Sequence, residues 1–202
     1  MKILIIGATG SIGREVTQQL LVQAKHHITL LARHLPQDVS SNQQTTWVQG
    51  DATQLATLQA MIAKQDAVII AVSGQIPAIV QTVITAMQAT KVTRLILVTS
   101  MGIYNEIPAK IGVTGNLEFN PVLRPYRQAA DLVTDSGLQY TIIRPGWFDN
   151  GNHHYEVTRK GQAFGGQSVS RWAVADLIQR SVQDKRLIYQ DLGINRPDEG
   201  GH

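Results

Sequence analysis

The sequence of 202 residues contains no cysteine and no long apolar run. The absence of cysteine excludes disulfides, thiol nucleophiles and zinc sites built from thiolates. No apolar run approaches the ~20 residues that a membrane-spanning helix needs. The run before Gly7 is also too short for a secretory signal, so we expect a cytoplasmic protein. Any redox chemistry must then use a borrowed cofactor.

The charge shows no concentration of one sign. Eighteen Lys and Arg residues against fifteen Asp and Glu residues give a formal net charge of +3, and the basic residues are scattered along the chain. Nucleic-acid binding normally needs a basic patch or stripe, so no nucleic-acid partner is expected, and no membrane partner either. A small-molecule ligand is the expected partner, with the chain a monomer or a weak homodimer.

Short apolar segments alternate with helix-like segments along the whole chain. This alternation is typical of βα units, so we predict one α/β domain over residues 1–202 with a parallel sheet and helices on both faces. Two irregular regions, 101–122 and 145–170, are expected to form the substrate-side pocket. Strands are predicted at 2–6, 27–32, 45–49, 66–71, 93–98 and 139–143, with a further edge strand at 186–190. Helices are predicted at 12–25, 54–64, 76–90, 124–135 and 172–184.

The stretch "GATGSIG" places Gly7, Gly10 and Gly13 between the first strand and the first helix. Glycines at such a turn let the backbone approach a pyrophosphate and aim the amide groups of the helix N-terminus at it. A tight turn without a ligand would use the same residues. Because the strand before the turn and the helix after it are both present, we interpret the motif as a dinucleotide site.

Arg33 indicates which dinucleotide is bound. NAD-binding folds carry an acidic residue about 20 positions after the glycines, whereas NADP-binding folds carry an arginine nearby for the 2′-phosphate. Arg33 lies 20 residues after Gly13, and no acidic residue occurs between positions 16 and 37. The sequence therefore favours NADP(H), the alternative being a solvated surface arginine.

Further motifs follow the expected strands: "ARH", "QGDATQ", "AVSG", "VTSMGIY", "SGLQYTIIRPGWF" and, in the last helix, "VSRWAVADLI". Together with the glycine turn they resemble the atypical short-chain dehydrogenase/reductase family, in its NmrA-like and biliverdin-reductase-B-like branch, over nearly the whole chain. The resemblance implies a doubly wound Rossmann sheet of order 3-2-1-4-5-6, with the cofactor across its C-terminal edge.

The resemblance also implies cofactor contacts. Asp51 would bind the adenine amine, although an aspartate here could equally be a turn or N-cap residue. The backbone at Pro145 and Gly146 would approach the nicotinamide carboxamide. The complete expected set is Gly7, Thr9, Gly10, Ser11, Ile12, Gly13, Arg33, Asp51, Ala52, Ala71, Val72, Ser73, Gly74, Ser100, Pro145, Gly146 and Trp147.

The usual catalytic pair of this family is missing. Typical members use a Tyr whose pKa is lowered by a Lys four residues later, and no tyrosine here has such a lysine. Trp147 stands where biliverdin-reductase-B-like proteins carry a histidine, so that proton donor is also absent. Ser100, Tyr104 and Tyr126 remain as candidate catalytic residues. We expect Tyr104, Tyr126, Trp147 and Phe148 to wall a flat pocket.

These features predict a reductase that transfers hydride from NADPH to a flat acceptor such as a flavin or quinone, because such acceptors need alignment more than a dedicated acid. The alternative is an NmrA-like regulator that senses NADP(H) without turnover. His153 and His154 are adjacent and lack carboxylate neighbours, so no metal site is expected.

Overall fold

The computed structural model describes residues 1–37 and 39–197. Its centre is an eight-stranded sheet of order β3-β2-β1-β4-β5-β6-β10-β8, parallel except where β10 meets β8. The first six strands confirm the predicted fold class and the order 3-2-1-4-5-6. The strands are β1 (Lys2–Ile6), β2 (His27–Ala32), β3 (Thr45–Gln49), β4 (Ala67–Ile70), β5 (Arg94–Val98), β6 (Gln139–Pro145), β8 (Glu156–Arg159) and β10 (Gln190–Asn195).

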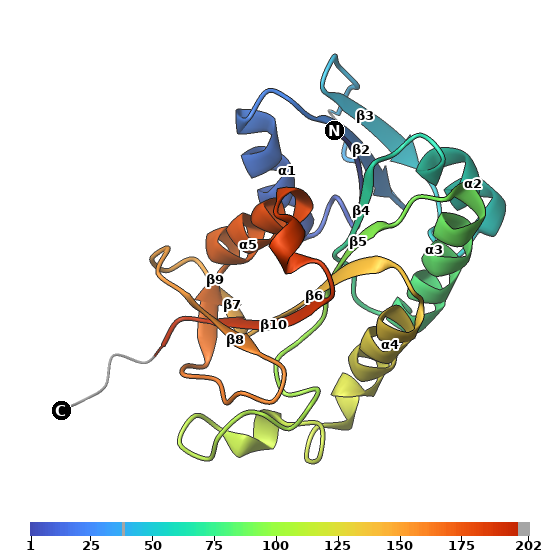
Figure 1. The fold of residues 1–202 in the computed structure, drawn as a ribbon. Helices are drawn as coiled ribbons and strands as arrows, with labels where there is room; N and C mark the ends of the chain where they lie inside the picture. The colour runs from blue at the N-terminus through green and yellow to red at the C-terminus, as the bar shows by residue number, and fades with distance from the viewer. Residues whose placement is uncertain (38, 198–202) are drawn as a thin grey trace.

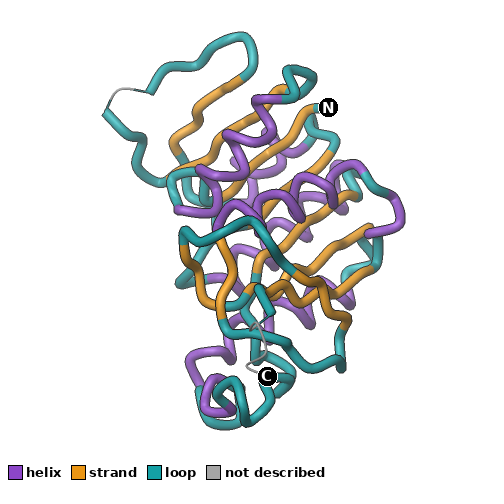
Figure 2. The backbone as a smooth tube through the Cα atoms, turned by 90° about the vertical axis from the view of Figure 1, so that its left-hand side faces the viewer, coloured by secondary structure: helices purple, strands orange, loops and turns teal. Residues whose placement is uncertain are grey.

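Helices cover both faces of the sheet (Figure 1). The helices α1 (Ser11–Val22) and α5 (Arg171–Gln183) pack on one face, and α2 (Leu55–Ile62), α3 (Ile76–Thr90) and α4 (Arg124–Asp135) pack on the other. Figure 2 shows the strands running side by side with helices laid across them. None of the helices in the described part of the chain is long and apolar enough to span a membrane.

The central strands are continuous apolar runs because both of their faces are covered. In β4, Val68 and Ile70 join the core under α2, α3 and α4, whereas Ile69 between them joins the core under α1 and α5. All three side chains are fully buried. The fold therefore rests on two apolar cores, one on each face of the same sheet.

Two expectations about the C-terminal half were wrong. The segment 186–190 does not form the last strand, because Lys185–Leu187 is a 3₁₀ turn and the strand β10 begins at Gln190. The region 145–170 is also less irregular than expected. It contains β8 and a separate parallel pair, β7 (Trp147–Asp149) and β9 (Ser168–Ser170).

Candidate cofactor and acceptor site

The three glycines of the turn after β1 have different structural roles. Gly7 has φ +93°, and a Cβ there would lie 2.2 Å from the Ala71 carbonyl oxygen. A Cβ on Gly13 would lie 2.2 Å from the Gly7 carbonyl oxygen, so this glycine lets α1 pack on the turn. At Gly10 the nearest backbone atom would be 3.2 Å away. That contact is tight but less severe than the other two, and of the three glycines Gly10 is the one that lines two adjoining hollows.

The N-terminus of α1 offers unneutralised backbone amides beside these hollows. Its N-cap, Gly10, has no side chain to satisfy them, and the first turn holds no acidic residue. Ser11 and Ile12 supply the first amides of the helix and line a hollow next to Gly10. Such a helix end favours negatively charged groups. Gly13 is buried behind it and serves packing.

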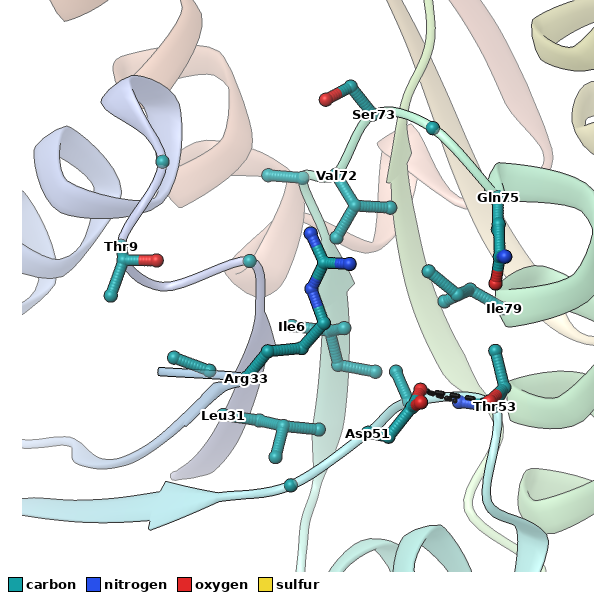
Figure 3. A pocket seen from close by; sticks show the side chains of 17 residues that line it. Ile6, Thr9, Leu31, Arg33, Asp51, Thr53, Val72, Ser73, Gln75 and Ile79 are labelled. Atoms are coloured by element: carbon teal, nitrogen blue, oxygen red, sulfur yellow. Dashed lines mark hydrogen bonds between the residues drawn. The ribbon is translucent and has the colours of Figure 1, made fainter. Parts of the chain in front are cut away.

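A hollow of ≈ 320 Å³ lies outside the carboxyl ends of β1, β2, β3 and β4 (Figure 3). This is where the strand order changes direction between β1 and β4, the usual ligand position in an open α/β sheet. Most residues predicted to contact the cofactor meet here. Those lining it are Gly7, Thr9, Gly10, Arg33, Asp51, Ala52, Ala71, Val72, Ser73 and Gly74.

Arg33 and Asp51 enter this hollow from neighbouring strands. Arg33 follows β2 and extends into the hollow toward Val72 (Figure 3). Asp51 follows β3, and its carboxylate accepts hydrogen bonds from the Thr53 amide at 2.8 Å and the Thr53 hydroxyl at 2.9 Å. These bonds, with the charge of Arg33, lower the pKa of Asp51. Asp51 therefore shapes the turn before α2, while Gln54 and not Asp51 is the N-cap.

A second hollow of ≈ 310 Å³ lies beyond the ends of β5 and β6, lined by Ser100, Tyr126 and Trp147 among others. A smaller hollow connects the two. It shares Gly10, Ala71, Val72 and Ser73 with the first and Thr99, Tyr126 and Phe148 with the second. One groove thus runs along the carboxyl edge of the sheet, from Arg33 to Trp147.

The second hollow is mainly apolar and contains two available hydroxyls. Neither the Ser100 hydroxyl nor the Tyr126 hydroxyl forms a hydrogen bond to another described residue, although both residues line the hollow. Trp147 is 66% exposed and Phe148 is 39% exposed, so each offers ring surface to a ligand. The remaining lining residues are Thr99, Met101, Ile107, Gly115, Asn120, Val122, Leu123, Pro145 and Gly146.

The expected position of Tyr104 was wrong. Its hydroxyl donates a hydrogen bond to Asp191 at 2.8 Å, and Tyr104 is not among the residues lining the second hollow. Burial raises the pKa of the Tyr104 phenol, and the neighbouring Asp191 charge raises it further. A phenol held in this way can neither reach an acceptor nor donate its proton readily.

The backbone at Pro145 and Gly146 lines the second hollow, and the amides of Gly146 and Trp147 are engaged by the sheet. Gly146 donates its amide hydrogen to Ile194 O, and Trp147 donates its own to Gln167 O, each at 2.9 Å. A Cβ on Gly146 would lie 2.5 Å from Gln167 O. Glycine is thus needed here for packing between strands. These amides are occupied by the sheet and are not free for a carboxamide.

His153 stacks on Trp172 with ring centroids 3.9 Å apart and planes 7° apart. Over residues 1–37 and 39–197, no group of three His, Asp or Glu side chains is arranged to hold a metal ion. Neither His153 nor His154 is among the residues that line the groove.

Residues 7–185 match the protein family described as NAD(P)H-binding. The chain belongs to that NAD(P)H-binding family. The family confirms a nicotinamide dinucleotide as the cofactor class, as the glycine turn predicted. No match was found among curated protein sequences.

Solved structures agree with the family. A Rossmann-fold NAD(P)-binding family protein from Shigella flexneri is 33% identical, with a TM-score of 0.81 over 100% of this chain and 96% of that chain. A short-chain dehydrogenase/reductase from Veillonella parvula in complex with NADP is 25% identical, with a TM-score of 0.88 over 97% and 94%. The fold is also that of ChuY, an anaerobilin reductase from Escherichia coli O157:H7, at 22% identity, 100% coverage of both chains and a TM-score of 0.82.

The groove of this NAD(P)H-binding protein fits a dinucleotide. The helix amides and the open side of Gly10 suit a pyrophosphate, and the hollow around Asp51 and Arg33 suits an adenosine half. Sequence reasoning missed Thr53, Gln75 and Ile79 on the cofactor side. It also missed the partners of Arg144, although an arginine inside the apolar strand "YTIIRP" could have signalled a buried carboxylate, since a buried charge needs a partner.

Proposed function

We propose that this protein is an NADPH-dependent reductase of flat, readily reduced acceptors of the flavin or quinone type. The observation that carries the proposal is the second hollow: an apolar, aromatic-walled space in line with the cofactor groove, with Ser100 and Tyr126 as its available hydroxyls. When bound, the reduced nicotinamide supplies the hydride.

The residues of the chain would orient the acceptor and exclude water. Trp147 and Phe148 offer ring surfaces for stacking, and Met101, Ile107 and Leu123 add an apolar wall. The Ser100 hydroxyl would hold an acceptor oxygen by a hydrogen bond. A flavin or quinone needs this alignment and takes its proton from solvent, whereas alcohol oxidation needs a base in the site. The engaged phenol of Tyr104 supports the first reaction over the second.

Preference for the phosphorylated cofactor is part of the proposal. Among the described residues that line the first hollow, Arg33 is the one cation, and it is exposed and able to pair with a 2′-phosphate. The Veillonella protein, which was crystallised with NADP, adds support from a relative.

The decisive experiment is to follow NADPH oxidation with riboflavin, FMN, menadione and a simple ketone as acceptors, the ketone being the substrate that an ordinary alcohol dehydrogenase would reduce. We expect turnover with flavins or quinones and little with the ketone. NADPH that binds by calorimetry but is not oxidised by any of these acceptors would favour an NADP(H)-sensing regulator instead. Rapid reduction of the ketone would contradict the proposal directly.

A further inference from the structure

A cluster of ionisable side chains lies next in sequence to residues that line the second hollow, which we call the acceptor hollow, and the proposed reaction does not use this cluster. Arg144 on β6 is fully buried. Its guanidinium pairs with Glu106, and its Nε donates to Asp191 Oδ1 at 2.6 Å. The Tyr104 hydroxyl donates to the other Asp191 oxygen at 2.8 Å. Tyr104 and Glu106 belong to the 101–122 loop, whereas Arg144 and Asp191 belong to adjacent strands of the sheet.

The cluster joins two segments that line the hollow. Glu106 directly precedes Ile107, Arg144 directly precedes Pro145, and both of these neighbours are lining residues. The second Glu106 oxygen accepts a hydrogen bond from the Tyr104 amide at 2.8 Å, which closes the turn that presents both side chains. The ion pair between Glu106 and Arg144 therefore links two segments that contribute lining residues to the hollow.

The 101–122 loop is internally tied, so it can be positioned as a unit. The Asn116 amide group accepts from Ile107 N at 2.9 Å and donates to Ile107 O at 2.9 Å. Gly102, with φ +81°, lies so close to Gly115 that a Cβ would be 2.4 Å from the Gly115 carbonyl oxygen. A displacement at Glu106 would consequently shift Ile107 and Gly115, which line the hollow, together.

Stability alone is a weak reason for such a cluster. The desolvation of buried charges largely offsets their attraction, so apolar residues of similar volume often do as well. The cluster nevertheless combines two carboxylates, a guanidinium and a phenol, and hydrogen bonds or ion pairs join all four groups. We propose that Tyr104, Glu106, Arg144 and Asp191 are positioning residues that set the width of the acceptor hollow. The class of acceptor that binds in this hollow rests on the proposed function, but the positioning of the 101–122 loop by these residues does not.

The chain contains a matched control for this inference. Tyr155 is another half-buried phenol, donating to Asp176 at 2.5 Å and accepting from Arg180 at 2.8 Å, but it packs against the core under α1 and α5. Tyr104→Phe and Tyr155→Phe each delete one hydroxyl bonded to a carboxylate. If Tyr104 had only a structural role, the two variants would lose similar stability and would bind riboflavin equally well.

The test measures riboflavin binding by quenching of its fluorescence, with NADP⁺ bound, and amide hydrogen exchange along the chain. We expect Tyr104→Phe to weaken riboflavin binding by roughly threefold to thirtyfold, and Glu106→Gln to weaken it further. Affinity for NADP⁺ should be unchanged in both. Exchange should accelerate in 102–118 and 146–149 for Tyr104→Phe, and in neither segment for Tyr155→Phe.

Equal effects of Tyr104→Phe and Tyr155→Phe on riboflavin binding would overturn the inference, as would unchanged exchange in 102–118 in Tyr104→Phe. Failure of the proposed function looks different, because the unaltered protein would then oxidise NADPH with neither a flavin nor a quinone. The exchange comparison would still decide whether the cluster positions the loop.

Discussion

The two halves of the groove are built in different ways. The cofactor half is made of short turns directly after β1, β2, β3 and β4, and its shape comes from backbone geometry at Gly7, Gly10 and Gly13. The acceptor half is made of two long segments held by side chains distant in sequence: Arg144 bonds to Glu106 across 38 positions and to Asp191 across 47. The first half is therefore encoded locally, whereas the second depends on tertiary contacts.

The largest expected effect is a loss of stability when a glycine of the cofactor half is replaced. Gly13→Val should unfold the protein or cost more than ~3 kcal/mol of stability, because the new Cβ would lie 2.2 Å from a backbone oxygen that cannot move freely. Urea denaturation measures the loss, with Gly10→Ala as the control of small expected effect. An unchanged midpoint for Gly13→Val would show that the tight packing of α1 on the turn is not needed.

Gly10→Val should separate binding from folding. Gly10 has φ −69° and ψ 163°, which valine adopts readily, so the fold should survive. The side chain would occupy the space expected for the pyrophosphate, and NADPH binding by calorimetry should be lost. A folded Gly10→Val protein, judged by circular dichroism, that still binds NADPH normally would contradict the phosphate assignment.

Arg33→Ala should remove most of the preference for NADPH over NADH. A charge-assisted hydrogen bond to the 2′-phosphate contributes about 1.5–3 kcal/mol, or roughly 10-fold to 150-fold in affinity. His34→Ala is the control, because His34 is the exposed neighbour that does not line the hollow. The proposal fails here if the unaltered protein binds both cofactors equally.

In the acceptor half, Trp147→Ala should weaken acceptor binding roughly tenfold through loss of ring stacking. Ser100→Ala should lower the rate by less, because one positioning hydrogen bond is lost and no proton donor. Phe119→Ala is the control, since Phe119 is 54% exposed on the 101–122 loop but does not line the hollow. A Phe119→Ala effect as large as that of Trp147→Ala would point to a general loosening of the acceptor half.

The same contrast explains what the sequence could predict. The strand positions and the cofactor hollow followed from apolar runs, the glycine spacing and Arg33, all of which are local signals, whereas the strand order was implied by the family resemblance. Tyr104 was placed wrongly because its position depends on Asp191, 87 residues away, and no pattern around Tyr104 encodes that contact. The hydrogen bond from the Gly146 amide to Ile194 on β10 was likewise not predicted, because it depends on a strand that the sequence placed a few residues too early.

The smallest expected effect is the pH-dependent contribution of Asp149 to stability. Asp149 at the end of β7 binds Arg196 at 2.5 Å, and this hydrogen bond lowers the Asp149 pKa to about 2 from 3.8. A carboxylate with a depressed folded pKa contributes stability that is present above the unfolded value and lost as the pH falls through the folded one. The pair is partly exposed, at 26% and 30%, so salt should reduce its contribution. Melting temperatures of the unaltered protein and Asp149→Asn should therefore differ slightly at pH 6 and converge between pH 3.8 and 2. A difference that persists at pH 2 would show that Asp149 acts through shape and not through its charge.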